Sequence, residues 1–106
     1  MLYEDVDFIE RVREKLNMTW EITPSEKSKI SNLIRDGQAW LENRTTNGVV
    51  DWENRFNQTM LIDWIRYDYN QAVEYFENNF HSELIVFIIR NDKQYELEKE
   101  LGESNG

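Results

Sequence analysis

The segment from Leu61 to Phe80, LIDWIRYDYNQAVEYFENNF, constrains the fold more than any other part of the chain. It is typical of a helix because apolar side chains recur at three- and four-residue intervals. With an advance of about 100° per residue, one apolar stripe collects Ile62, Ile65, Tyr69, Ala72, Val73, Phe76 and Phe80. A second apolar stripe on the opposite side collects Met60, Trp64, Tyr67 and Tyr75. A surface helix of a small monomer needs only one such stripe.

Two explanations account for the second stripe. The helix could be central in a bundle, with other helices of the same chain covering both of its apolar sides. Alternatively, the second stripe could contact another copy of the chain, since Trp, Tyr and Met are enriched at the cores of protein interfaces. The sequence therefore predicts Met60, Trp64, Tyr67 and Tyr75 as candidate subunit-interface residues, and the intrachain alternative stays open.

The composition favours one small helical domain. The chain has 106 residues, with one proline and four glycines, so few residues interrupt helices. It has no cysteine, which excludes both disulfides and thiolate metal sites. We expect an all-α fold, a small bundle of about four helices with a long central helix and an extended C-terminal arm.

The first two helices have recognisable signals. A helix is predicted over residues 5–17, where apolar residues fall at helical spacing. The second helix has the clearest start in the chain, TPSE, in which Thr23 can act as N-cap, Pro24 takes the first helical position and Glu26 completes a capping box. This helix is expected to end near the ENRTTNG segment.

The second half of the chain is predicted as the long helix, a further helix and an arm. The long helix is expected over residues 57–78. LIVFII, residues 84–89, would also suit a buried strand because it is rich in β-branched residues, but no partner strand is visible, so a fourth buried helix is favoured. We expect residues 1–90 to form the helical domain and residues 91–106 a charged C-terminal arm.

Charge and hydropathy exclude several classes of function. The formal net charge of -9 argues against sequence-independent binding of nucleic acid, which needs a basic surface. The longest apolar run, residues 84–89, is far shorter than a membrane span. The N-terminal MLYEDVDF has neither a basic nor an apolar region of the kind found in signal peptides. We therefore expect no membrane association.

The residues give little support to an enzyme. His81 is the only histidine, and without cysteine any His-based catalytic site depends on it. Runs of carboxylates such as EDVD and ELEKE lack the glycine turn and ordered spacing of a calcium loop, so they are interpreted as solvated acidic surface. We predict no catalytic residue, no cofactor and no metal site.

The order of elements resembles a known family. A short first helix (VDFIERVREKL) and a capped second helix (TPSEKSKISNLIRDGQAWLEN) precede LIDWIRYDYNQAVEYFENNFHSEL. Over roughly residues 5 to 90 this pattern resembles the small head–tail connector proteins, or head-completion adaptors, of long-tailed bacteriophages. The most telling part is IRYDYN…EYFENNF…EL, from Ile65 to Leu84.

The resemblance implies a structural virion protein. Such adaptors assemble as a ring beneath the portal protein, usually of twelve copies, and extend the DNA channel toward the tail. The implied partners are other copies of the chain, the portal, a downstream stopper or tail protein, and double-stranded DNA that passes without specific binding. By analogy the C-terminal segment would reach the portal, with Tyr95, Leu97 and Leu101 as contact residues. The implied location is the head–tail neck of a virion made in the bacterial cytoplasm.

A different class of function stays open beside this one. A dense carboxylate surface can imitate the phosphates of DNA. The chain could therefore be a small acidic binding module, or DNA mimic, that inhibits a host nucleic-acid-binding protein. That alternative assigns no role to the second apolar stripe.

Overall fold

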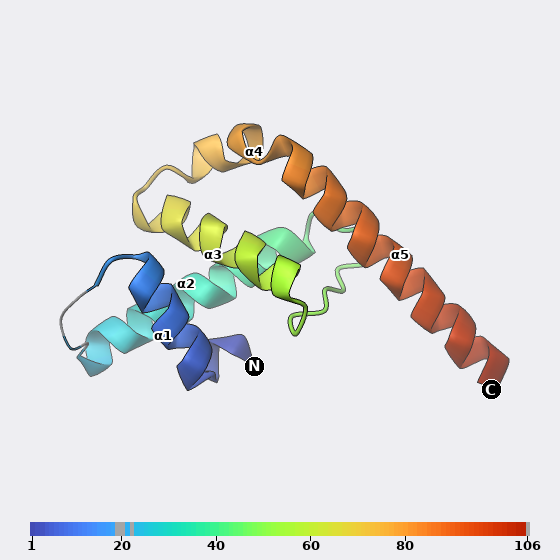
Figure 1. Ribbon diagram of the computed structural model, residues 1–106, viewed down its shortest axis with the longest axis horizontal. Coiled ribbons are helices and arrows are strands. Elements are labelled where there is room, and N and C mark those ends of the chain that lie inside the picture. The colour runs from blue at the N-terminus through green and yellow to red at the C-terminus, as the bar shows by residue number, and fades with distance from the viewer. Residues whose placement is uncertain (19–20, 22, 106) are drawn as a thin grey trace.

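The computed structural model describes residues 1–18, 21 and 23–105 and confirms the all-α fold (Figure 1). The α-helices among these residues are α1 (Val6–Lys15), α2 (Pro24–Glu42), α3 (Arg55–Tyr69), α4 (Phe76–Asn79) and α5 (His81–Asn105). The 3-10 turns η1 (Leu2–Glu4) and η2 (Val73–Tyr75) precede α1 and α4. Helices α1 to α3 pack together, and α5 runs past them and away from the bundle.

The first two helices begin where local sequence signals predict. The Asp5 carboxylate accepts a hydrogen bond from the Phe8 backbone N–H at 3.1 Å and caps α1. The Thr23 hydroxyl accepts from the Glu26 N–H at 3.2 Å and donates to the Glu26 carboxylate at 3.1 Å. With Pro24 at the first position, the predicted start of the second helix is confirmed.

The core forms mainly where α2 crosses α3. Gly37 is buried at this crossing, and a Cβ placed on it would lie 2.5 Å from Leu61 Cδ1 and 2.8 Å from Trp64 Cε3. The helices can therefore approach this closely only because residue 37 has no side chain. Fully buried side chains around the crossing and the helices beside it include Val12, Ile30, Ile34, Leu41, Leu61, Ile65, Phe76 and Phe87.

The prediction of one long helix over residues 57–78 is wrong, because α3 ends at Tyr69. Gln71 takes a left-handed conformation with φ 56°, and its N–H bonds the Asp68 carbonyl at 3.0 Å. The Ala72 N–H bonds the Tyr67 carbonyl at 2.8 Å. This pair of bonds is a Schellman motif, which satisfies the last carbonyls of a helix and turns the chain out of it.

The reversal after α3 folds the aromatic segment back on itself. The ring of Tyr67 meets Phe76 edge-on at 5.6 Å between centroids and Phe80 at 5.5 Å. Phe76 also stacks on Phe80 at 4.8 Å and meets Trp40 of α2 edge-on at 5.5 Å. In a straight helix, the side that carries Tyr67 would be uncovered. The reversal instead packs Tyr67 against Phe76 and Phe80, which follow it in the chain.

Helix α5 is buried on one face only, so the prediction of a buried fourth helix over residues 84–89 is correct for that face and wrong for the others. Leu84 and Phe87 are buried, while Ile85, Val86 and Ile89 are exposed. Further along the same face, the side chains of Asn91 and Asn57 exchange two hydrogen bonds, at 3.0 and 3.1 Å, and both residues are buried.

The molecule is elongated because α5 extends beyond the other helices. Its principal extents are 51 × 31 × 17 Å and its radius of gyration is 15.2 Å, against about 13 Å expected for a compact domain of this size. The boundary expected after residue 90 falls inside this continuous helix, next to buried Asn91. Within the described residues, no helix combines the length and apolar character that crossing a membrane requires.

Candidate interaction surface

The structure separates the four predicted interface residues. Met60 and Trp64 are 2% and 4% exposed within the single chain, so their prediction as subunit contacts is wrong: their side chains fill the core around α2 and α3. Tyr67 is half-buried against Phe76. Tyr75 is 58% exposed. The assignment of Tyr75 to a subunit interface stays a prediction. The same holds for the part of the Tyr67 side chain that is not buried.

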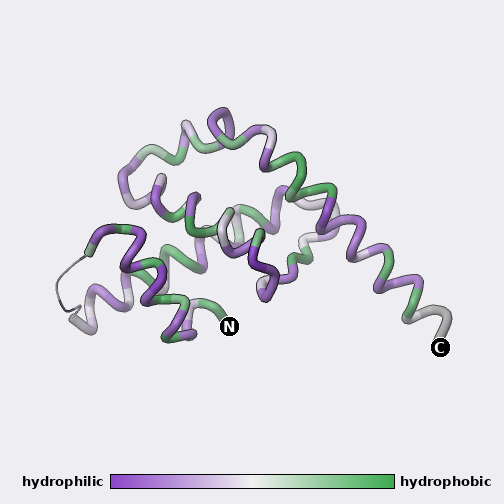
Figure 2. The backbone as a smooth tube through the Cα atoms, in the orientation of Figure 1, coloured by the Kyte–Doolittle hydropathy of each residue, from purple (hydrophilic) through white to green (hydrophobic). Residues whose placement is uncertain are grey.

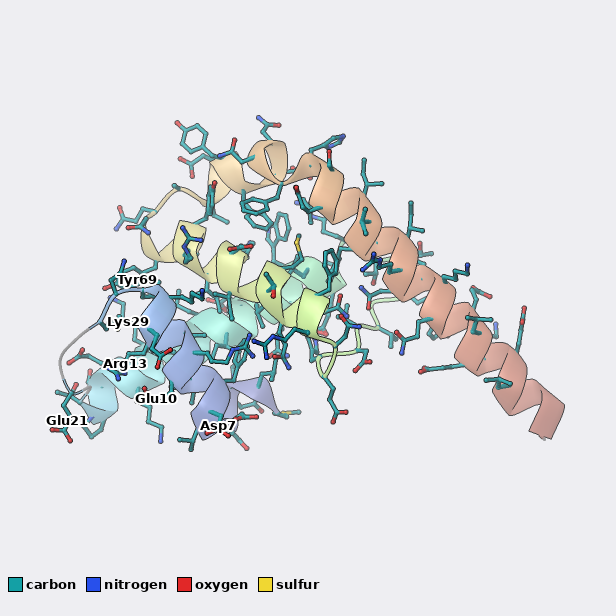
Figure 3. All side chains as sticks on the ribbon, viewed as in Figure 1. Asp7, Glu10, Arg13, Glu21, Lys29 and Tyr69 are labelled. Atoms are coloured by element: carbon teal, nitrogen blue, oxygen red, sulfur yellow. The ribbon has the colours of Figure 1, made fainter. Side chains whose placement is uncertain are left out.

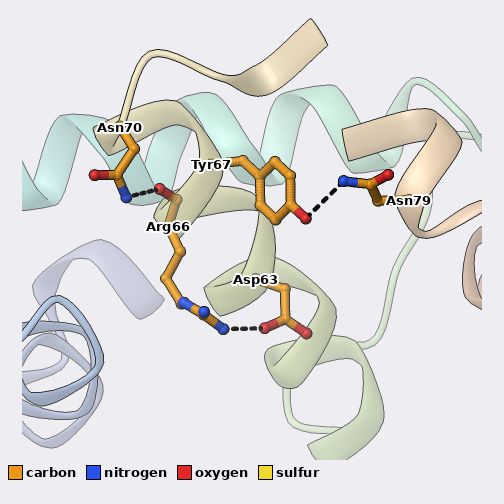
Figure 4. Close-up of polar contacts among 5 residues, drawn as sticks. All are labelled: Asp63, Arg66, Tyr67, Asn70 and Asn79. Carbon is orange, nitrogen blue, oxygen red and sulfur yellow. Dashed lines mark hydrogen bonds and ion pairs between the residues drawn. The ribbon is translucent and has the colours of Figure 1, made fainter. Parts of the chain in front are cut away.

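Polar contacts hold the chain reversal in place around Tyr67 (Figure 4). The Asn79 side chain donates to the Tyr67 hydroxyl at 3.0 Å, which ties α4 to α3. Asn70 donates to the Arg66 carbonyl at 2.7 Å, and Arg66 pairs with Asp63 at 3.2 Å. The hairpin from α3 to α4 is therefore held in place by contacts within the single chain.

The three residues predicted to contact the portal also differ in how exposed their side chains are. Tyr95 is half-buried and lines a hollow beside Val49 and Val50, so it faces the chain's own loop. Leu97 and Leu101 are 50% and 63% exposed on the part of α5 that leaves the bundle. Only these two leucines have the accessibility that a contact with another molecule needs.

Sequence reasoning missed an apolar row that continues these leucines along α5. Four exposed apolar residues and one lysine follow one another at four-residue intervals, and we call them the α5 ridge: Ile85, Ile89, Lys93, Leu97 and Leu101. Figure 2 shows the alternation of apolar and polar segments along this helix. The ridge lies away from Leu84, Phe87 and Asn91, which face the bundle. The four-residue repeat was the signal in the sequence, hidden because LIVFII is apolar on every side.

The contacts of α5 with the bundle fix which way the ridge points. Besides the Asn57–Asn91 pair, Asp92 accepts from the N–H and the hydroxyl of Thr46 at 3.0 and 2.7 Å. The Arg90 guanidinium lies over the Phe56 ring, 4.9 Å from its centroid. These contacts hold the first half of α5 against α3 and the loop before it.

At the far end of the bundle from the tip of α5, charged groups find partners within the chain (Figure 3). The Lys29 ammonium lies 5.8 Å from the centroid of the Tyr69 ring, and Glu10 pairs with Arg13 at 2.9 Å.

In the part of the chain that the structure describes, the pKa is raised for the carboxyl groups of Glu42, Asp63 and Asp68. Burial raises the pKa of Asp63, and the charge of Arg66 offsets part of the rise. Burial also raises the pKa of Asp68, and the negative charge of Asp36 raises it further. Burial raises the pKa of Glu42, and the nearby Trp52 side chain counters this in part, although the indole N–H of Trp52 has no hydrogen bond of normal geometry within the described chain. Nowhere in residues 1–18, 21 and 23–105 do three His, Cys, Asp or Glu side chains form a group able to hold a metal ion.

Together these features define a small all-α protein whose last helix carries an uncovered apolar ridge. No protein-family model, curated protein or solved structure matches this chain.

Proposed function

We propose that the protein is a structural virion component, a ring-forming head–tail connector that docks on a portal protein and joins head to tail. The observation that carries the proposal is the part of α5 that leaves the bundle, with Leu97 and Leu101 exposed at 50% and 63%. An apolar pair on a protruding helix suits insertion into a groove of a partner, since apolar helix faces commonly dock in this way. The order of elements described above supplies the resemblance to connectors.

The acidic balance of the chain supports the same proposal. A net charge of -9 disfavours attachment to DNA, because binding along the phosphate backbone is driven by basic side chains that release counterions. A channel through which double-stranded DNA slides gains from walls that do not hold it. On this proposal DNA passes the ring without specific binding, and the downstream neighbour is a stopper or tail protein.

A ring also requires two different patches on each subunit, because head-to-tail contacts are heterologous. Tyr75, exposed at the chain reversal, is the candidate for one patch. The second patch would come from another face of the molecule. The proposed ring has twelve copies, as is usual for such rings. The proposed location is the virion neck, after synthesis in the bacterial cytoplasm.

The test is to mix the purified protein with the portal protein of its own phage and to image the mixture by negative stain. Annular particles seated on the portal are expected. Replacing both leucines, Leu97→Glu with Leu101→Glu, should abolish docking. The matched control is Val6→Glu on α1, which changes an apolar residue of equal exposure, 63%. Small particles only, in the presence and absence of the portal, would refute the proposal.

A second candidate function is an acidic binding module or DNA mimic. The second half of α5, residues 94–105, favours it, since it carries four glutamates and one lysine. This function predicts a salt-sensitive complex with a basic, nucleic-acid-binding host protein and no ring in any mixture. Replacing Glu96, Glu98 and Glu100 by Gln separates the two candidates, because it should weaken capture of a basic partner while Leu97 and Leu101 still support docking on the portal.

A further inference from the structure

The loop between α2 and α3 contains an asparagine that is followed directly by a glycine. Asn47 and Gly48 are both exposed and lie outside the helices. Gly48 takes a left-handed conformation with φ 70°, and a Cβ built on it would have nothing within 4 Å. The backbone at this position is therefore accessible to solvent and free of neighbouring side chains on that side.

An asparagine side chain can react with the backbone nitrogen of the residue that follows it. The nitrogen loses its proton to a base in the solvent and attacks the side-chain carbonyl carbon. The amide nitrogen regains a proton and leaves as ammonia, and the product is a cyclic imide. Water then opens the ring at either of its carbonyls and gives aspartate or isoaspartate. The net reaction consumes one water and releases one ammonia, without an oxidant or reductant, and a following glycine hinders it least because glycine has no Cβ.

We propose that Asn47 is a site of spontaneous covalent modification, at which the backbone nitrogen of Gly48 converts the side-chain amide into the carboxylate of aspartate or isoaspartate. Other exposed asparagines lack this neighbour: Asn43 and Asn54 are each followed by an arginine, whose side chain hinders the attack. They are internal controls within the same molecule. Asn105 is also followed by a glycine, but Gly106 lies outside the described residues.

The hydroxyl of Thr45 controls the rate of this reaction. Its oxygen accepts a hydrogen bond from the Gly48 N–H at 2.9 Å, and the hydroxyl donates to the Glu42 carbonyl at 2.8 Å. Thr45 is buried, so both bonds hold the hydroxyl in one position. The nitrogen that has to lose its proton before it attacks is thus bonded through that proton to an acceptor. The fold therefore slows the modification of Asn47 but does not prevent it.

Modification of Asn47 weakens one of the contacts that hold α5 to the bundle. Thr46, the residue before it, donates its N–H and its hydroxyl to the Asp92 carboxylate at 3.0 and 2.7 Å. A carboxylate at position 47 adds a negative charge one residue away from that contact, and like charges repel. Isoaspartate also adds a carbon atom to the main chain before Gly48, which displaces the Gly48 N–H from Thr45. Both changes loosen the loop that binds Asp92.

Peptide mapping by mass spectrometry tests the site, after incubation of the purified full chain at mildly alkaline pH. Asn47 should convert to the acid while Asn43 and Asn54 keep their amides. Thr45→Val should raise the rate about two- to tenfold, the factor that corresponds to the loss of one hydrogen bond. Thr45→Ser keeps the hydroxyl and should react like the unaltered chain, and circular dichroism checks that each variant is folded. Equal rates for Thr45→Val and Thr45→Ser would refute the role of the hydroxyl.

An intact Asn47 in the folded chain, after a period in which the urea-unfolded chain is fully modified, would overturn the proposal. So would an intact Asn47 in both. Hydrogen exchange at the Thr46 amide tests the consequence for α5. Exchange should be faster in the isoaspartate-containing chain than in the unaltered chain, with Asn47→Asp, which adds the charge alone, in between. Unchanged exchange would refute the weakened contact with Asp92. These tests use the purified chain alone, so they can fail whether or not the protein is a connector.

Discussion

At the level of single residues, Gly37 determines how closely α2 and α3 can approach. Alanine at this position would place a methyl group 2.8 Å from the Trp64 ring and 2.5 Å from Leu61. The leucine methyl can move, but the buried indole cannot move easily. We expect Gly37→Ala to lower the free energy of unfolding by about 1–2 kcal/mol, because overpacking outweighs the better helix propensity of alanine.

Urea denaturation measures this effect as a lower midpoint with an unchanged slope. Gly102→Ala is the matched control, since a Cβ at that helical glycine has nothing within 4 Å. It should leave stability equal or slightly greater. Equal stability of both alanine variants and the unaltered chain would show that α2 and α3 can separate at this crossing without cost.

The paired amides of Asn57 and Asn91 give a second prediction for single residues. Asn91→Ala leaves the Asn57 carbonyl oxygen without the partner it has at 3.1 Å, in a buried position. The expected loss is about 1–3 kcal/mol. The double replacement, Asn57→Leu with Asn91→Leu, should cost less stability than the sum of its two single variants, Asn57→Leu and Asn91→Leu. In the double variant neither amide is left without its partner. Additive losses from thermal unfolding of the four proteins in this cycle would contradict the pairing.

At the level of secondary-structure elements, the end of α3 depends on Gln71. Its φ of 56° lies in the left-handed region, where β-branched residues are strongly disfavoured. Gln71→Val should therefore cost about 1–2 kcal/mol, whereas Gln71→Gly should be neutral or stabilising. Thermal unfolding of the two variants measures the difference. Equal melting temperatures would mean that the chain reversal does not need this backbone conformation.

The two apolar stripes predicted for residues 61–80 have different roles, and charge substitutions separate them. Trp64→Glu should cost more than about 4 kcal/mol, because it puts an unpaired carboxylate among buried apolar groups. Tyr75→Glu should change stability by less than about 0.5 kcal/mol, because Tyr75 is exposed. Circular dichroism during urea denaturation measures both. If Trp64→Glu stayed as stable as Tyr75→Glu, the burial of the indole would be contradicted.

The elements also show what the sequence could predict. The start of α2 was predictable because its cap, Thr23 with Pro24 and Glu26, is local. The end of α3 was not, since neither Asn70 nor Gln71 is a strong helix breaker. The reversal is stabilised by contacts with Phe76 and Phe80, which follow later in the chain. Met60 and Trp64 were misassigned because α3 is covered on more than one side within the chain, and Trp64 packs against Gly37 and Trp40 of α2. Leu97 and Leu101 were named as portal contacts by the family resemblance alone, and the structure shows that both are exposed.

At the level of the whole molecule, the raised pKa values of Glu42, Asp63 and Asp68 link stability to pH. A carboxyl whose pKa is higher in the folded than in the unfolded chain binds more protons when folded, at any pH between the two values. Unfolding then releases protons. The free energy of unfolding therefore rises as pH falls from neutral through the folded-state pKa values, and the gain is complete below the unfolded ones, near pH 4.

We therefore expect the melting temperature to increase as the pH is lowered from 7 toward about 5, unlike that of a protein stabilised by ionised carboxylates. Relief of the repulsion within a chain of net charge -9 acts in the same direction, so the comparison of variants decides the cause. Glu42→Gln with Asp68→Asn should be more stable than the unaltered chain at pH 7 and should show a flatter pH dependence. Glu98→Gln with Glu100→Gln, at exposed positions on α5, removes the same charge and should keep the steeper dependence. Parallel pH profiles for the two double variants would assign the effect to net charge alone.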